Sequence, residues 1–454
     1  MSEPVGLVAR QPAQRRTVPR AAAFWLLAAV LFLLFIASAA PSPLYRVYQA
    51  QWRFSATTLT VIFAVYALVL LITLLLFGSL SDYLGRRRVI AVGLALAAAA
   101  CGLFLVADGP GVLLAARAVQ GVAVGVATGA LGAALIDLQP AGSGRGPLAS
   151  SAVPGAGLAV GALGTSALVQ YAPDPTHLVW WVLLGAFLAG IGVVLVLPEP
   201  ATTRPGVLHS LRPRVGVPRD ARGVFAIAVP CIVAVWALGG LYLSLGPSLA
   251  VELTASPDLL WGGLVIFLLS GTGAAAATAF RSAVPATAML TGCLFLLAGV
   301  AVTLAGIATT TAAAFLAGTA VAGVGFGVAF LGAFRSTVEM AAPGDRAGLI
   351  AAVYIVSYLA FSIPAVIAGA ATARFGLHDT AVVYSAAIVA LVAAAAGSFV
   401  IRRRAPRAQP RPALQPCDPP PGPCTAPPCA PAVRSAAATV SADRPRPAPG
   451  PGSR

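Results

Sequence analysis

The stretch that decides the fold is Gly78-Ser79-Leu80-Ser81-Asp82-Tyr83-Leu84-Gly85-Arg86-Arg87-Arg88, a polar segment between two apolar runs. Each run is about 20 residues long, the length that crosses the hydrocarbon core of a bilayer as a helix. Gly78 allows the preceding helix to approach a neighbour closely, and Gly85 permits a tight turn. The three arginines can reach anionic headgroups. The stretch therefore predicts a loop at the membrane edge between two transmembrane helices.

The rest of the chain repeats this alternation of apolar runs and short polar segments. Of the 454 residues, 59% are hydrophobic and 9% are charged, whereas a soluble domain has about 25% charged residues. This composition excludes an ordinary soluble protein. The apolar windows predict twelve transmembrane helices near residues 21–40, 57–77, 89–107, 111–136, 149–169, 178–197, 225–248, 259–280, 284–305, 312–334, 347–370 and 380–401.

Arginine supplies all 29 basic residues of the chain, whose net charge is +15. A basic balance is typical of nucleic-acid binding, but here the arginines alternate with the predicted helices, so we expect a lipid bilayer as the partner and no nucleic acid. With the N-terminus inside, 25 arginines fall on the inner side, three on the outer side and one within a helix. The positive-inside rule then predicts a multi-pass protein of the cell (inner) membrane with both termini cytoplasmic.

The beginning of the chain permits one alternative. Four arginines, an apolar stretch and Ala37-Ser38-Ala39 resemble a secretory signal with a small-residue cleavage site. Cleavage there would leave eleven helices and would break the symmetry of the two halves of the chain.

The twelve predicted helices divide into two halves of nearly equal length. Gly121-Val-Ala-Val-Gly125 is followed by Asp137 at the same interval that separates Gly323-Val-Gly-Phe-Gly327 from Glu339. Such repeats predict two six-helix bundles of a transporter with a binding site between them. The predicted organisation is a cytoplasmic Arg-rich N-tail (1–20), an N-terminal six-helix bundle (21–198), a cytoplasmic linker (199–223), a C-terminal six-helix bundle (224–401) and a disordered Pro/Ala/Arg-rich cytoplasmic tail (402–454).

The string at 78–88 resembles the loop signature of the major facilitator superfamily, Gly-x-Leu-x-Asp-(Arg or Lys)-x-Gly-Arg-(Arg or Lys), with Tyr83 in place of the usual basic residue. The resemblance implies an all-α membrane protein with twelve transmembrane helices in two six-helix bundles. It also implies a gating loop. That loop comprises Gly78, Asp82, Gly85 and Arg86, of which Asp82 and Arg86 would help to hold the cytoplasmic sides of the bundles together and would release them when access switches.

Arg117 lies inside the fourth predicted helix, where a charged side chain must face protein or water. Gln120 and Gly121 share its helix face because they follow at i+3 and i+4. No acid lies at a predicted midplane, which leaves carbonyls, Gln120, tyrosine hydroxyls, water or the substrate as partners. A purely structural arginine is the alternative. The string Arg117-Ala-Val-Gln120-Gly121 also resembles the family's Arg-x-x-Gln-Gly signature, whose arginine is linked to proton coupling.

Aromatic side chains are the other candidates for lining a cavity, namely Tyr66, Trp236, Tyr354 and Tyr358. Aromatic residues near helix ends also form interfacial belts, which is the competing interpretation. A cavity of this kind suits hydrophobic or weakly polar molecules better than sugars, whose hydroxyl groups need many buried partners. Gly157-Leu-Ala-Val-Gly161-Ala162-Leu163-Gly164 resembles the antiporter signature of the family's drug/proton antiporters without its proline.

These features predict a secondary active transporter that works by alternating access and exports hydrophobic or amphipathic small molecules in exchange for protons, as a monomer. A metabolite importer or uniporter is the alternative, in which Arg117 would bind a substrate anion. A membrane-embedded transferase would need paired carboxylates for metal and diphosphate, and the sequence has no Asp-rich pair. No P-loop lies between the helices, so we expect no enzyme activity, no cofactor and no metal site.

Overall fold

The computed structural model describes residues 18–140, 143–199, 215–342 and 344–404, which are nearly all helical. The first half contains α1 (Arg20–Ala39), α2 (Pro41–Trp52), α3 (Ala56–Phe77), α4 (Ser81–Leu84), α5 (Arg86–Leu105), α6 (Pro110–Leu138), α7 (Arg145–Tyr171) and α8 (Leu178–Val196). The second half contains η1 (Arg219–Ala221), α10 (Arg222–Ser244), α11 (Gly246–Thr254), α12 (Leu260–Ala279), α13 (Pro285–Ala308), α14 (Ala312–Val338), α15 (Arg346–Phe375) and α16 (Leu377–Arg404). The predicted N-tail before residue 18, the linker residues 200–214 and the C-terminal tail from residue 405 lie outside the described residues.

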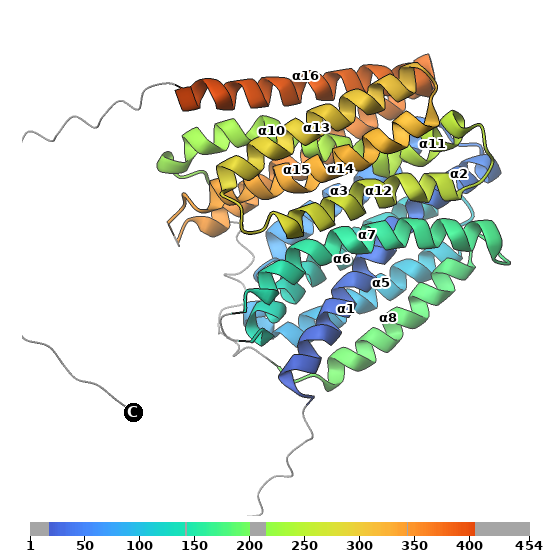
Figure 1. The fold of residues 1–454 in the computed structure, drawn as a ribbon. Helices are drawn as coiled ribbons and strands as arrows, with labels where there is room; N and C mark the ends of the chain where they lie inside the picture. The colour runs from blue at the N-terminus through green and yellow to red at the C-terminus, as the bar shows by residue number, and fades with distance from the viewer. Residues whose placement is uncertain (1–17, 141–142, 200–214, 343, 405–454) are drawn as a thin grey trace, which may run out of the picture. The chain divides into compact units, whose positions relative to one another are not determined.

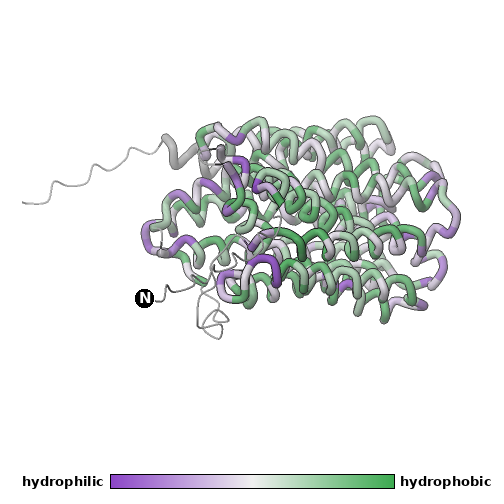
Figure 2. Tube along the Cα trace, turned by 90° about the horizontal axis from the view of Figure 1, so that it is seen from below, coloured by the Kyte–Doolittle hydropathy of each residue, from purple (hydrophilic) through white to green (hydrophobic). Residues whose placement is uncertain are grey.

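Twelve helical segments of the described chain are long and apolar enough to cross a membrane, which confirms the predicted number. Only segments that satisfy their own backbone hydrogen bonds are stable in hydrocarbon, so these apolar sequences form helices. Figure 2 shows hydrophobic residues along the helices and most hydrophilic residues at their ends. Figure 1 shows α1, α5, α6, α7 and α8 on one side of α12 and α10, α13, α14, α15 and α16 on the other, with α3 of the first half drawn among the helices of the second.

The first helix of each half is interrupted, which the predicted ranges 21–40 and 225–248 did not include. α1 stops at Ala39 and α2 begins at Pro41, while α10 stops at Ser244 and α11 carries Pro247 in its first turn. Proline has no N–H and fits the first turn of a new helix. Arg46, expected in an outer loop, is therefore helical in α2.

We call the helix ends beside residues 78–88 the motif side and the opposite ends, beside residues 53–55, the distal side. α3 packs against α15, and α7 packs against α12, across the two halves. Three hydrogen bonds between described residues join the halves toward the distal side. They run from Arg46 Nη1 to Ser248 O (3.4 Å), from Thr57 Oγ1 to Gly369 O (3.3 Å) and from Leu259 N to Gln170 Oε1 (3.0 Å).

Candidate functional site

The predicted gating loop, residues 78–88, consists of a turn, the short helix α4 and the start of α5. Gly85 joins the two helices with φ of +94°, a conformation that favours glycine. A Cβ atom at Gly85 would lie 2.9 Å from Glu199 Oε2. Gly78 lies at the end of α3, where a Cβ atom would lie 2.5 Å from the carbonyl oxygen of Leu74. Both predicted glycines therefore occupy places where a side chain does not fit easily.

Glu199 anchors this loop from the start of the linker. Its carboxylate accepts hydrogen bonds from the backbone N–H groups of Arg86 (2.7 Å) and Arg87 (3.1 Å). These donors belong to the first turn of α5, which has no side-chain cap of its own, and a carboxylate at a helix N-terminus also opposes the positive end of the helix dipole. Sequence analysis assigned Glu199 no role, because its partners lie more than 100 residues away in the chain.

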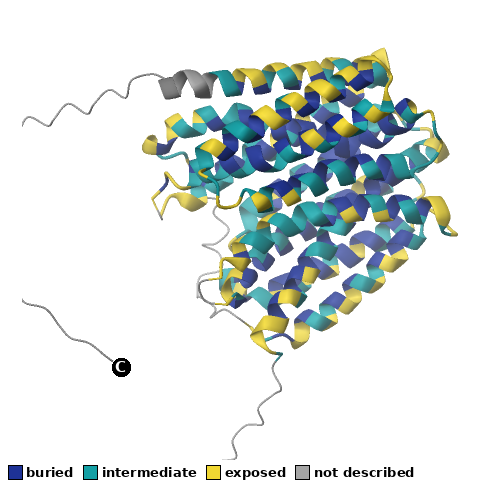
Figure 3. Cartoon of the chain, viewed as in Figure 1, coloured by how far each residue is buried: buried dark blue, intermediate teal, exposed yellow. Residues whose placement is uncertain are grey.

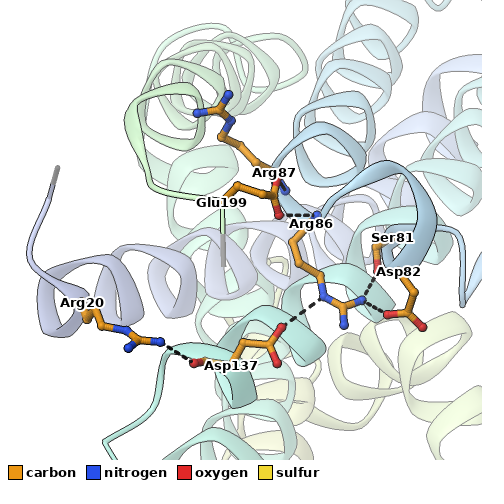
Figure 4. A network of polar contacts seen from close by, with 7 residues as sticks. All are labelled: Arg20, Ser81, Asp82, Arg86, Arg87, Asp137 and Glu199. Carbon is orange, nitrogen blue, oxygen red and sulfur yellow. Dashed lines mark hydrogen bonds and ion pairs between the residues drawn. The ribbon is translucent and has the colours of Figure 1, made fainter. Parts of the chain in front are cut away.

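Arg86 is the centre of the polar network at the motif side (Figure 4). Its guanidinium forms an ion pair with Asp82, contacts Ser81 Oγ at 2.6 Å and reaches Asp137 Oδ2 at 3.3 Å. Asp137 ends α6, and its carbonyl accepts a hydrogen bond from Arg20 Nη2 at 3.4 Å. These partners of Asp82 and Arg86 lie within the first half, and the described residues show no ion pair from Asp82 to the second half.

Arg117 is enclosed by protein, with 1% of its surface exposed. Nη1 donates to Gln120 Oε1 at 2.6 Å and to the carbonyl of Ser38 at 3.3 Å. Gln120 Nε2 in turn donates to the carbonyl of Ala37 at 2.8 Å. In a continuous helix that carbonyl would bond the N–H of residue 41, but Pro41 has none. The break between α1 and α2 thus supplies an acceptor inside the membrane.

Two tyrosine rings complete the surroundings of this cation. The guanidinium carbon of Arg117 lies 4.1 Å from the ring centroid of Tyr66 and 6.0 Å from that of Tyr45. A desolvated cation–π contact contributes about 2 kcal/mol, and the C-terminal end of α1 adds a partial negative charge. Two of the predicted partner types, a backbone carbonyl and the Gln120 side chain, bind the guanidinium of Arg117. Arg117 is therefore accommodated without a carboxylate. Its Nε–H has no hydrogen-bond partner.

Gly121 fixes the distance between α6 and α3. A Cβ atom at Gly121 would lie 2.6 Å from the carbonyl oxygen of Tyr66. The absence of a side chain lets the two backbones approach, and this approach brings the Tyr66 ring onto Arg117. Tyr66, predicted to line a cavity, belongs to the Arg117 pocket instead.

The other predicted aromatic residues come together in the second half. Trp236, Phe330, Phe334, Tyr354 and Tyr358 form a closed ring of neighbours with centroid distances of 5.3 to 6.4 Å. We call this set the aromatic ring. All five side chains are only partly buried, and the indole N–H of Trp236 has no hydrogen-bond partner among the described residues. The ring is an aromatic, polarisable surface whose polar groups are this N–H and the hydroxyls of Tyr354 and Tyr358.

Sequence analysis missed the phenylalanines of this ring and the residue that connects it to the first half. Phe361 lies 5.7 Å from Trp236 and 4.8 Å from Phe63 in α3, measured between ring centroids. The spacing of Phe326, Phe330 and Phe334 is four residues, which places them on one face of α14 and was the available signal. No cluster of three or more His, Cys, Asp or Glu residues that could bind a metal occurs in the described ranges.

Comparisons with known proteins agree with this geometry. The family model of the Major Facilitator Superfamily matches residues 27–298. The nucleoside transporter NupG superposes with a TM-score of 0.62 at 12% identity, covering 84% of this chain and 99% of that one. The human organic anion transporter MFSD10 (TETRAN) gives 0.59 at 17% identity, covering 84% of this chain and 100% of that one. No curated protein matches the chain in sequence.

At such low identities the solved structures show that the fold is shared, and they do not identify the substrate of this chain. The family match carries more, because it extends over more than half of the sequence and includes the gating loop and the Arg117 string. The twelve membrane-crossing helices of the described residues agree with this match. The chain belongs to the Major Facilitator Superfamily, whose members are membrane transporters.

Proposed function

We propose that this protein is a secondary active transporter that exports hydrophobic or amphipathic small molecules by alternating access, driven by protons. The observation that carries the proposal is the aromatic ring with its unpartnered Trp236 N–H. Binding sites for small molecules are mainly apolar, with a few polar groups that orient the ligand. A ring of this composition would accept a planar or branched apolar molecule that carries at least one hydrogen-bond acceptor.

Arg117 is the proposed link to the proton. Its position matches the arginine of the Arg-x-x-Gln-Gly signature, and its charge is balanced by carbonyl oxygens and tyrosine rings, with no carboxylate partner among the described residues. Such a balance depends on the break between α1 and α2, so a movement of either helix would change the environment of the charge. Asp82 and Arg86 are the proposed gate, which would exchange partners within the first half for partners in the second half.

A second candidate is an importer or uniporter of an organic anion. One observation favours it: Arg117 Nε is a buried donor without a partner, in a region of the membrane where the described residues offer no acid. An anionic substrate that reached this pocket would supply the missing acceptor.

Transport in proteoliposomes decides between the two candidates. The purified protein is reconstituted and supplied with a panel of neutral, cationic and anionic aromatic compounds, with and without an imposed proton gradient. Proton-linked export predicts accumulation of neutral or cationic compounds only when the gradient is present. Gradient-independent equilibration of anions alone would contradict it and would support the second candidate.

We also propose that the protein lies in the cell membrane as a monomer, with both termini cytoplasmic. Single cysteines at Gly216, before η1, and at Asp174, between α7 and α8, test the orientation in a background from which the native cysteines are removed. A membrane-impermeant thiol reagent added to intact cells should label the cysteine at 174 and spare the one at 216. Labelling at 216 alone would reverse the orientation.

A further inference from the structure

The second half contains a groove whose lining includes none of the residues proposed above for substrate binding or gating. It has a volume of about 640 Å³ and lies between α10, α15 and α16. Its lining is apolar over most of its length, with Val233, Ala237, Pro364, Ala368, Ala387 and Leu391 among the residues that form it. Sites that accept organic molecules have volumes of about 300 to 1,000 Å³. The groove is therefore large enough for a ligand.

Local sequence explains the open space. Pro364 lies inside α15 and removes one hydrogen bond of that helix, which bends it. The small side chains of the lining residues Ala237, Ala368 and Ala387 do not fill the space between the helices. The polar groups of the lining that lie inside are satisfied: Tyr384 Oη donates to Ala237 O at 2.8 Å, and Thr380 Oγ1 donates to Gly376 O at 2.8 Å. No spare donor within the groove would orient a polar substrate, in contrast to the aromatic ring.

The groove opens on the face of the second half that meets lipid. Ile367 is 63% exposed, and Phe375 and Val383 are each 68% exposed. α16 packs against α10, α11, α13 and α15, all of the same half, and Figure 3 shows exposed residues along it. In a membrane-spanning chain such a face is surrounded by the hydrocarbon of the bilayer, so lipid acyl chains contact the groove.

The length of the groove corresponds to one leaflet. Along α16 it extends from Asp379, in the first turn at the distal side, to Leu391. Twelve residues of helix span about 18 Å, and one leaflet contributes about half of a hydrocarbon core of about 30 Å. The groove thus begins at the distal membrane surface and ends near the bilayer centre, as an acyl chain does.

The mouth of the groove carries opposite charges. Asp379 lines it with an exposed carboxylate, and Arg374, in the last turn of α15, is exposed one residue before the lining residue Phe375. A carboxylate repels anionic headgroups and attracts an ammonium group, and an arginine pairs with phosphate. We propose that this groove binds one acyl chain of a distal-leaflet phospholipid that has a primary-amine headgroup, with the amine at Asp379 and the phosphate at Arg374.

Native mass spectrometry of the full-length protein tests the proposal without a transport assay, so its failure is independent of the proposed function. The detergent-solubilised protein is titrated with dioleoyl phosphatidylethanolamine and, separately, dioleoyl phosphatidylglycerol. We expect one high-affinity phosphatidylethanolamine, bound at least about fivefold more tightly than phosphatidylglycerol. Asp379→Asn should bring the two affinities to within about twofold of each other.

A matched pair of substitutions tests the groove itself. Ala387 and Ala386 are both exposed on α16, and only Ala387 lines the groove. Ala387→Trp should lower the affinity of the tight lipid about tenfold or more by filling the space, while Ala386→Trp should leave it unchanged. Equal lipid binding by both variants would overturn the proposal, as would equal binding of the two lipids by the wild type. Displacement of the lipid by a transported compound, one for one, would assign the groove to substrate instead.

Discussion

The two halves of this transporter share a backbone plan and differ in chemistry. Each half starts with a helix that is interrupted near a proline, at Pro41 and at Pro247. Each has a glycine that brings two helices together, Gly121 against α3 and Gly323 against α12. Helix packing is thus the property that the two halves have in common, because it determines whether either bundle forms.

The polar groups are not duplicated. Thr319 stands 202 residues after Arg117, the interval that also separates Gly121 from Gly323. Its hydroxyl lies 2.8 Å from Tyr242 Oη, so the second half has a neutral hydrogen bond where the first half has a buried cation. The aromatic ring, conversely, lies entirely in the second half. The buried cation and the proposed gate thus lie in the first half, and the aromatic surface proposed to bind substrate lies in the second.

The largest effect is expected from glycines that both halves share. Gly121→Val and Gly323→Val should each abolish folding or lower the melting temperature strongly. A Cβ would lie 2.6 Å from the Tyr66 carbonyl oxygen in the first case and 2.6 Å from that of Leu269 in the second. Overpacking costs about 1 to 3 kcal/mol when side chains can yield, and a backbone cannot.

Yield and melting temperature in detergent measure this effect. Gly164→Val is the control, because nothing lies within 4 Å of a Cβ at that position. Loss of stability in only one of the variants Gly121→Val and Gly323→Val would contradict the inference that the two halves depend on the same close helix packing.

The next largest effect on transport is expected to distinguish Arg117 from Thr319, the residue at the equivalent position in the second half. Arg117→Met should fold, because methionine fills much of the same volume, yet lower gradient-driven transport about tenfold or more by removing charge-assisted hydrogen bonds. Arg117→Lys should also impair transport, since lysine lacks the planar group that lies over Tyr66. Thr319→Val should reduce stability by about 1 kcal/mol and leave transport nearly unchanged.

Melting temperature measured beside flux distinguishes coupling from structure for this pair. If Arg117→Met and Arg117→Lys lose stability before transport can be assayed, the arginine is structural. Stable variants with unchanged coupling would remove Arg117 from the mechanism.

A smaller effect distinguishes the ion pairs at the motif side. Asp82 pairs with Arg86 within a network that includes Asp137, while Glu339 pairs only with Arg335, at 3.1 Å and largely exposed. Asp82→Asn should reduce transport about fivefold, equivalent to about 1 kcal/mol, and Glu339→Gln less than about twofold. Initial transport rates of the two variants are compared at matched protein levels in the membrane. Equal effects of Asp82→Asn and Glu339→Gln would contradict a specific role of the gating loop.

The smallest effect concerns the aromatic ring. Trp236→Phe keeps an aromatic side chain and removes the unpartnered indole N–H. We expect the KM for a substrate with a hydrogen-bond acceptor to rise about threefold, with the maximal rate retained, because a neutral hydrogen bond contributes about 1 kcal/mol. Substrates without an acceptor are the control and should show no change. A fall in maximal rate with constant KM would place Trp236 outside the substrate site.

The sequence was sufficient for the twelve helices and for the turn at Gly85 because both depend on local composition: apolar length predicts a span, and glycine predicts a turn. The partners of the predicted residues depended on distant neighbours. A local rule predicts that Pro41 leaves the carbonyl of Ala37 without its helical partner. The hydrogen bond that Gln120 donates to this carbonyl follows only from the packing of α6 against α1. The contact of Glu199 with α5 was beyond prediction for the same reason, whereas the four-residue spacing of the α14 phenylalanines placed them on one helix face without naming their neighbours.

The most direct test of alternating access between these halves is a pair of distances measured by electron paramagnetic resonance in lipid nanodiscs. Spin labels at Leu84 and Val284 report on the motif side, and labels at Val106 and Thr310 report on the distal side; all four positions are exposed. Because three hydrogen bonds between the halves lie toward the distal side, we predict that substrate shifts the population toward a shorter motif-side distance and a longer distal-side distance. Distances that stay constant, or that change in the same direction, would contradict the account.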